Sequence, residues 1–390
     1  MHINIIEEAK KNHDTVVSWR RALHQIPELG IELPQTVAFV AGKLTEMGIP
    51  YEVYEDCSCV AATIGKGGKC ILLRGDMDAL PVKEESGLPF ASTTALSHAC
   101  GHDFHAASLL GAAKILKEHE TELPGTVKLI FQSGEEVFKG AAAAISHGVM
   151  ENPKVDAAFA THVFASLPLN TVGYGKYPMA SVYGFRIRIQ GKGTHGSSPE
   201  TGIDPLTVGA NILLSLQEII AREIPAAEEA ALTIGHFEGG SAANVIPDSA
   251  ILEGTLRAFK PEVKAYIMPR ITEIAESIAK AYRASVTVEE LSNCPAVAVD
   301  DGMMQMMLDA VRELDNGMVP VNALHAMGSE DFACYSELVP SVIVAMGAGV
   351  EDKTKWVGQH NPKILFNEDI LLNEVALYVK MAVDFLEKNK

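Results

Sequence analysis

The sequence predicts an α/β protein: a main domain with a mostly parallel central sheet flanked by helices, and a smaller inserted domain. A chain of 390 residues exceeds what one hydrophobic core usually organises. Apolar strands alternate with helices over residues 1–180, which is typical of a parallel sheet. After residue 180 the strands alternate apolar and polar positions, as in an antiparallel sheet with one face in solvent.

The first part of the main domain, residues 1–180, begins with two amphipathic helices and continues with alternating strands and helices. The run Cys70-Ile71-Leu72-Leu73 is apolar throughout, which indicates a strand buried on both faces. In chain order the sequence predicts helices at 5–23 and 35–47, strands at 51–55, 59–64 and 70–75, a helix at 103–118, a strand at 127–131, a helix at 138–148 and a strand at 157–160.

Residues 181–293 carry a second pattern. The predicted order is a strand at 183–190, a helix at 205–222, strands at 230–237 and 249–258, a helix at 261–282 and a strand at 285–291. This β-α-β-β-α-β order is that of a ferredoxin-like unit. Residues 294–390 then return to a helix at 303–314, an apolar strand at 341–346 and a helix at 368–387. We therefore expect 181–293 to be inserted between the two parts of the main domain.

Composition limits the possible partners and surroundings. The net charge of −18 argues against nucleic acid, which needs a basic face. The N-terminal segment carries charges where a signal peptide needs an apolar run, and no apolar stretch approaches the roughly 18 residues that span a bilayer. Six cysteines in 390 residues do not form a disulfide framework. We expect a soluble, cytoplasmic protein with no membrane partner.

Histidine, cysteine and aspartate side chains gather between residues 98 and 105, where a loop leads into a helix. The segment holds His98, Cys100, His102, Asp103 and His105. Thiolate and imidazole groups suit zinc and related divalent metals. The alternative is a helix start with Asp103 in its first turn and surface histidines. The density of these residues favours a metal site.

Further candidates follow other strands of the predicted sheet. Glu135 and Glu136 come after one strand and could divide two roles, one binding metal and the other taking a proton. Asp78 follows another strand and could orient a ligating histidine, as could Asp103. His162 ends a third strand, and His360 lies in a late loop. Taken singly, an acidic helix start or an Asp-rich turn is the favoured explanation of each carboxylate. Together they point to one site at the carboxyl edge of the sheet.

A glycine-rich segment invites a nucleotide-binding interpretation. Residues 191–196 match G-x-G-x-x-G. However, the preceding strand alternates with charged residues, and the next helix opens only near Pro205. Neither H-E-x-x-H nor G-x-S-x-G is present, which argues against the common zincin and serine-hydrolase sites. These observations disfavour a dinucleotide site.

The chain resembles the aminoacylase and carboxypeptidase-G-like di-metal metallopeptidases, especially the branch of hippurate hydrolases, N-acyl-amino-acid deacetylases and indole-acetyl-amino-acid hydrolases. The motifs run in family order from residue 20 to 362: R-R-A-L-H-Q-I-P-E-L-G at 20–30, D-M-D-A-L-P at 76–81, H-A-C-G-H-D at 98–103, G-E-E at 134–136, G-T-H at 193–195, N-V-I-P-D at 244–248, G-S-E-D-F at 328–332 and H-N-P at 360–362.

The resemblance implies a catalytic main domain with an inserted satellite domain used for dimerisation, and a role for each matched residue. The implied metal ligands for two divalent ions (Zn, Mn, Co or Ni) are Cys100, His102, Glu136, His162 and His360, with Cys100 bridging. Glu135 is the implied general base. His195 is expected to reach the active site of a partner subunit and polarise the scissile carbonyl. Asn244 and Arg257 resemble the residues that hold the substrate's carboxylate.

We therefore expect a metal-dependent amidohydrolase acting on small N-acyl amino acids. A dipeptidase or other exopeptidase on the same scaffold, or a binding protein that has lost catalysis, are the alternatives. A homodimer or homotetramer is expected, since an open ferredoxin-like sheet has edges that need cover. Ser97 and Phe104 depart from the family's usual residues, which affects the expected fit of the acyl group and not the metal chemistry.

Overall fold

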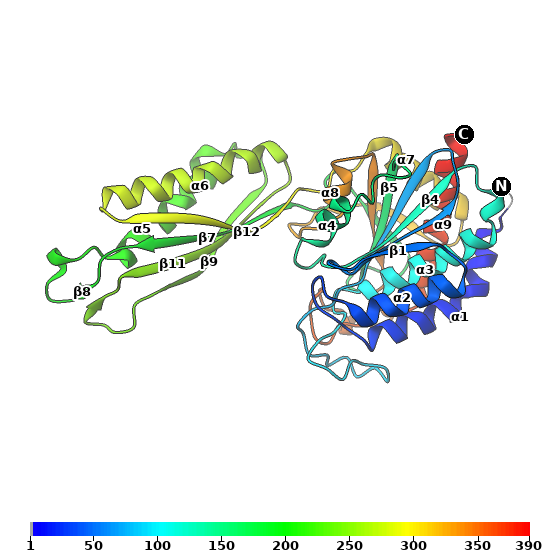
Figure 1. The fold of residues 1–390 in the computed structure, drawn as a ribbon, viewed down its shortest axis with the longest axis horizontal. Helices are drawn as coiled ribbons and strands as arrows, with labels where there is room; N and C mark the ends of the chain where they lie inside the picture. The colour runs from blue at the N-terminus through cyan, green and yellow to red at the C-terminus, as the bar shows by residue number, and fades with distance from the viewer. Residues whose placement is uncertain (1–2) are drawn as a thin grey trace. The chain divides into compact units, whose positions relative to one another are not determined.

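The structure is a computed structural model that describes residues 3–390 (Figure 1). It divides into two compact units. Of the described residues, unit 1 comprises 3–178, 298–325 and 331–390, and unit 2 comprises 179–297 and 326–330. The sequence placed the boundaries near 180 and 293. It did not predict that residues 326–330 join unit 2.

Unit 1 is built on an eight-stranded sheet with the order β1-β2-β4-β3-β5-β14-β6-β13. The strands are β1 (Tyr51–Tyr54), β2 (Cys59–Gly65), β3 (Cys70–Asp76), β4 (Thr126–Gln132), β5 (Ala157–Phe164), β6 (Thr171–Tyr174), β13 (Val319–Asn322) and β14 (Ser341–Gly347). The central strands β4, β3, β5 and β14 pair in parallel, while β1–β2, β2–β4 and β14–β6 pair antiparallel. The predicted mostly parallel sheet is confirmed.

Burial explains why the central strands form. Every residue of β3, β4 and β14 is buried, as expected for strands covered on both faces. Helices α3 (His102–Glu118) and α9 (Ile370–Lys388) pack against these strands, and α1 (Ile5–His24) packs against both helices. The remaining helices of unit 1 are α2 (Pro34–Glu46), α4 (Gly140–Ser146), α7 (Asp301–Leu314) and α8 (Ala333–Ser336).

Unit 2 has a four-stranded antiparallel sheet with the order β12-β7-β11-β9. Its elements are β7 (Ser181–Gln190), β8 (Thr194–His195), α5 (Pro205–Glu218), β9 (Ala230–Gly239), β10 (Val245–Ile246), β11 (Ser249–Ala258), α6 (Pro261–Ala281) and β12 (Ser285–Cys294). Buried residues of both helices, such as Ile212 and Ile267, pack with strand residues Ile187 and Leu252 in one core. This is the β-α-β-β-α-β arrangement expected from the sequence.

Two strands of unit 1 were absent from the prediction. Both β6 and β13 have only four residues, and all four residues of β13 are exposed. Pro320 lies within β13, and proline is tolerated at a sheet edge because the edge leaves some N–H groups unpaired. Such short segments carry no hydrophobic periodicity. Among the helices of residues 3–390, none is long and apolar enough to cross a membrane.

Candidate metal centre

Most of the candidate ligands lie where the central parallel strands of unit 1 end. Glu135 and Glu136 follow β4, His162 lies near the end of β5, and α3 begins at His102. Because neighbouring parallel strands end at the same edge, residues far apart in the sequence meet there.

Gly101 gives the ligand-bearing loop its shape. It has a φ of +92°, a left-handed conformation that side chains other than glycine rarely adopt. A Cβ at this position would also lie 2.4 Å from Cγ2 of Val163 on β5. Glycine therefore lets the chain turn into α3 while Cys100 and His102, on either side, both face the strand ends.

The ligand atoms form two groups that share Cys100. One group is Cys100, His102 and His162, and the other is Cys100, Glu136 and His360, with the atoms of each group within 4.8 Å of one another. The Cys100 Sγ lies 3.5 Å from His162 Nε2. The His360 Nε2 lies 3.3 Å from Glu136 Oε1. The arrangement can hold two ions with one thiolate common to both groups.

Glu135, which directly precedes Glu136 in the sequence, lies beside these groups. Its Oε2 is 3.9 Å from His102 Nε2, while Glu136 Oε1 is 3.8 Å from the same nitrogen. Glu135 also forms a third candidate group with His102 and Glu136. The two neighbouring carboxylates are thus both presented to the centre.

The protonation of the centre is set by burial and by neighbouring charges. Burial raises the pKa of the Cys100 thiol to about 12, and the Glu136 carboxylate adds to this. Burial alone would lower the pKa of His102, but Asp76 and Cys100 raise it well above its usual value. Burial lowers the pKa of His162 well below its usual value, and His105 adds to this.

Several polar atoms of the centre have no hydrogen-bond partner within the described chain. They are both ring nitrogens of His102 and Oε1 of Glu136, and all three atoms are buried. Buried polar atoms without partners cost free energy, so such atoms in a native site call for an explanation. Divalent cations supply it, since thiolate, imidazole and carboxylate are their ligands. The residues therefore fit a metal centre.

A polar neighbour on the far side of each ring selects the ring nitrogen that faces the centre. The Nδ1 of His162 lies 2.9 Å from the carbonyl oxygen of Val163, which can only accept. Nδ1 therefore carries the hydrogen, and Nε2, toward Cys100, keeps its lone pair. On His102, Nδ1 lies 3.4 Å from Asp78 Oδ1, and Nε2 faces the two glutamates.

Asp78 positions the two glutamates, and it also positions His102. Its two carboxylate oxygens accept the backbone N–H groups of Glu135 and Glu136, each at 3.1 Å. The Asp78 side chain is fully buried, so water does not replace these bonds. One carboxylate thus holds both the loop after β4 and a candidate ligand from α3.

Replacing Asp78 by asparagine should weaken metal binding about 10- to 100-fold, the usual cost of losing a group that orients a ligand. Asparagine offers one acceptor oxygen where the structure uses two. Metal affinity would be measured by competition with a chromogenic chelator. Asp315→Asn, at an exposed position, is the control. An unchanged affinity in Asp78→Asn would show that Asp78 does not position the ligands.

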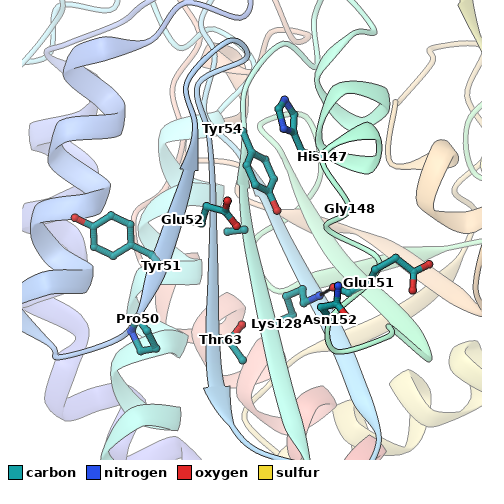
Figure 2. A pocket seen from close by; sticks show the side chains of 11 residues that line it. Pro50, Tyr51, Glu52, Tyr54, Thr63, Lys128, His147, Gly148, Glu151 and Asn152 are labelled. Atoms are coloured by element: carbon teal, nitrogen blue, oxygen red, sulfur yellow. Dashed lines mark hydrogen bonds between the residues drawn. The ribbon is translucent and has the colours of Figure 1, made fainter.

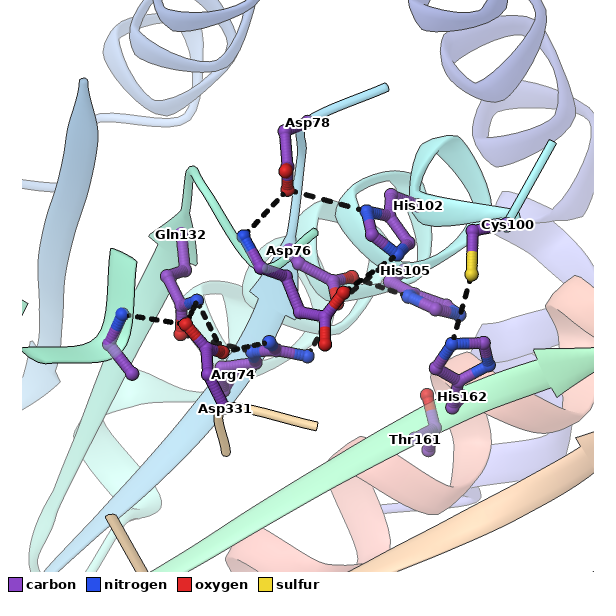
Figure 3. A network of polar contacts seen from close by, with 12 residues as sticks. Arg74, Asp76, Asp78, Cys100, His102, His105, Gln132, Thr161, His162 and Asp331 are labelled. Carbon is purple, nitrogen blue, oxygen red and sulfur yellow. Dashed lines mark hydrogen bonds and ion pairs between the residues drawn. The ribbon is translucent and has the colours of Figure 1, made fainter. Parts of the chain in front are cut away.

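A buried network that the sequence did not predict supports the centre (Figure 3). The Nδ1 of His105 donates to Asp76 at 2.5 Å, since its Nε2 accepts the N–H of Val163. Asp76 also accepts from Arg74 at 2.6 Å, and Arg74 donates to Asp331 at 2.9 Å. Asp76 and Asp331 had been noted only as parts of motifs. A signal was present, because Arg74 and Asp76 lie within a strand that is otherwise apolar and buried.

Asp103 does not contact a candidate ligand, contrary to expectation. Its Oδ2 accepts a hydrogen bond from His24 Nδ1 at 2.7 Å and forms an ion pair with Arg20 Nε, also at 2.7 Å. Successive helix residues point about 100° apart, so His102 and Asp103 at the start of α3 face different neighbours. Asp103 therefore ties α3 to α1 instead of orienting a ligand.

The remaining candidates lie in unit 2. His195 is exposed, and its Nδ1 lies 2.7 Å from Ser197 Oγ. Strand β8 pairs with β10, which brings Asn244 beside the same turn, where its carbonyl accepts the N–H of Gly196 at 2.7 Å. Arg257 is on β11 and donates to Ser329 Oγ at 2.6 Å.

Known proteins share this sequence and fold. Residues 72–384 match peptidase family M20/M25/M40. The chain is 36% identical to an N-acetylcysteine deacetylase of Bacillus subtilis, over 98% of this chain and 99% of the relative. It is 36% identical to an IAA-amino acid hydrolase of Arabidopsis thaliana, over 97% and 88%. A dinuclear metal-binding M20 peptidase of Bacillus subtilis has a TM-score of 0.81 and 34% identity, over 97% and 99%.

These likenesses confirm the resemblance drawn from the motifs. The matched region includes every candidate ligand, and the relatives are similar to this chain over nearly its whole length. The likeness to a dinuclear metal-binding peptidase agrees with the two donor groups that share Cys100. The chain is a hydrolase that belongs to peptidase family M20/M25/M40.

Proposed function

We propose that the protein hydrolyses the amide bond of small N-acylated amino acids with the help of two divalent metal ions. The observation that carries the proposal is the pair of donor groups sharing Cys100, with Glu135 beside them. Relatives named as a deacetylase of N-acetylcysteine and a hydrolase of IAA-amino acids support this substrate class.

In this proposal Cys100, His102, Glu136, His162 and His360 hold the two ions, with Cys100 in both groups. When bound, such ions lower the pKa of a water to about 7 and polarise a carbonyl. Zinc, manganese, cobalt and nickel all suit the donor types, and their availability selects among them.

Glu135 has the proton-transfer role. It is nine-tenths buried or more, and its carboxylate lies 3.9 Å from His102, so it is held close to the proposed ligands. It takes a proton from the attacking water and passes a proton to the nitrogen of the leaving amine. The products are a carboxylic acid and a free amino acid.

Unit 2 supplies the groups that recognise the substrate. Arg257 and Asn244 bind the carboxylate of the amino-acid part. His195 donates to the carbonyl oxygen as negative charge develops on it. These roles follow from the family resemblance, and the side chains belong to donor types that suit them.

Hydrolysis of a substrate panel tests the proposal. We expect metal-dependent release of a free amino acid from one class among N-acetyl, N-benzoyl and indole-acetyl amino acids. Chelator should abolish the activity, and added Zn²⁺, Mn²⁺ or Co²⁺ should restore it. Free dipeptides serve as the comparison. Turnover of dipeptides alone would favour the exopeptidase alternative, and no turnover with any metal would contradict the proposed function.

We also propose that the protein is a cytoplasmic homodimer or homotetramer. Among the described residues, none of the six cysteines forms a disulfide, which suits a reducing compartment. Strands β9 and β12 are the open edges of the unit 2 sheet, and exposed apolar side chains lie on this unit, including Leu214 on α5 and Leu291 on β12. Such edges and side chains are usually covered by a partner.

Mixing two inactive variants tests whether His195 acts in a partner subunit. His195→Ala and Glu135→Gln should each be inactive alone. Mixed dimers would combine an intact His195 with an intact Glu135 in one of their two sites. Random reassociation should therefore restore about a quarter of wild-type activity. No recovery after proven subunit exchange, or full activity of a monomer in ultracentrifugation, would contradict the role.

A further inference from the structure

The turn between β1 and β2 and the end of α4 together hold a second cluster of metal-ligating side chains, outside the candidate centre. Asp56, Cys57 and His147 present one ligand atom each, and these atoms lie within 4.8 Å of one another. His147 Nε2 is 2.7 Å from Asp56 Oδ1. Asp56 and His147 are exposed, and Cys57 is buried behind them. The cluster therefore opens to solvent on one side.

The ring of His147 is held in place by Tyr54. The two rings stack with their centroids 4.7 Å apart and their planes 12° apart. Figure 2 shows Tyr54 on its strand beside His147, which directly follows α4. A surface histidine held by stacking loses less side-chain freedom when it binds a ligand.

The pKa of Cys57 is lowered to about 7. The neighbouring Cys59 thiol donates to the Cys57 sulfur, and this hydrogen bond is the largest cause of the lowered pKa, with a contribution from His147. The same pairing, together with burial, raises the pKa of Cys59. A thiolate is the form of cysteine that binds metals.

We propose that Asp56, Cys57 and His147 form a binding site for a further divalent transition-metal ion, with Zn²⁺ as the expected ion. One thiolate, one imidazole and one carboxylate are zinc ligands, and a water completes four-coordination. Carboxylate-only sites favour Mg²⁺ or Ca²⁺, whereas the sulfur ligand selects against them. The site is separate from the proposed catalytic centre and does not depend on it.

The ion would stabilise the loop that carries Glu135. The carbonyl oxygen of Cys57 accepts a hydrogen bond from Ser133 Oγ. The Sγ of Cys59 lies 3.5 Å from Ser133 Oγ. Ser133 directly precedes Gly134 and Glu135. Fixing the turn at Cys57 therefore fixes one side of the segment between β4 and the glutamates. The inferred role is structural.

Counting bound metal tests the site. Full-length protein is stripped with chelator, equilibrated with Zn²⁺, and its metal content per chain is determined. We expect Cys57→Ser and His147→Gln each to bind one ion fewer than the wild type. His119→Gln is the matched control, since His119 forms a similar pair with Glu122 at 2.9 Å. It should retain the wild-type count.

Cobalt spectra of a Cys100→Ser background separate this site from the catalytic centre. With Cys100 removed, cobalt–thiolate charge-transfer absorption should persist, and adding Cys57→Ser or His147→Gln should abolish it. A spectrum without this absorption in Cys100→Ser, or one unchanged by both added substitutions, overturns the site. So does a zinc count that is equal in wild type, Cys57→Ser and His147→Gln. Because the readout is a difference of one ion, it is independent of whether the catalytic centre binds its two.

Discussion

Replacing Glu135 by glutamine should lower kcat by roughly 10²- to 10⁴-fold, the usual contribution of a general base, while the metal content stays at the wild-type level. Glutamine keeps the size of the side chain but cannot accept a proton. The backbone N–H of residue 135 would still donate to Asp78, so the loop should keep its shape. The measurement combines steady-state kinetics on the substrate found by the panel with elemental analysis of the purified variant.

Glu136→Gln is the matched control. Its carboxylate belongs to a donor group with Cys100 and His360, so its loss should lower metal content as well as activity. The two neighbouring substitutions thus separate proton transfer from metal binding. Glu135→Gln with near wild-type kcat would disprove the proposed base. Equal loss of metal from both variants would make Glu135 a ligand.

Replacing Arg74 by methionine should lower the free energy of unfolding by about 3–5 kcal/mol, the cost of removing one partner from a buried ion pair. Arg74 and Asp76 are fully buried, and Asp331 is 1% exposed. Without the guanidinium, two buried carboxylates would lose their shared arginine and keep their other hydrogen bonds, including those from His105 to Asp76 and from Gln132 to Asp331. Urea unfolding of the metal-free protein measures the change without any contribution from bound ions.

Arg21→Met provides the control within the same unit. Arg21 also binds a carboxylate, with two nitrogens on Glu368, but its side chain is 48% exposed. Exposed pairs contribute about 0–1 kcal/mol, because water solvates each charge when the pair is broken. Similar losses in the two variants would contradict the stabilising role given to the buried network.

The sequence was sufficient for the order of the main elements and for the candidate ligands. Strands β3, β4 and β5 are apolar runs, and a parallel sheet brings their ends to one edge. Asp78, Glu135 and His162 are therefore recognisable as neighbours without any structure. Periodicity is a local signal that long, well-buried elements carry strongly.

The local sequence pattern did not predict the strands and contacts that depend on segments far away in the sequence. Strand β13 pairs with β6 at the edge of the sheet, and its own residues are exposed. Asp103 shares a motif with His102, yet it contacts Arg20 and His24 of α1. In both cases the partner comes from a distant segment, so residue type and spacing leave the contact open.

The sequence by itself determined an α/β chain with an inserted β-α-β-β-α-β unit, and the residue types that a metal-dependent hydrolase needs. Only the tertiary structure decided that Arg74 pairs with Asp331 across 257 positions and that Cys57 lies close to His147. The physical reason is that periodicity and local motifs encode how each segment folds. Contacts between segments depend on packing, burial and charge, which arise when the whole chain is assembled.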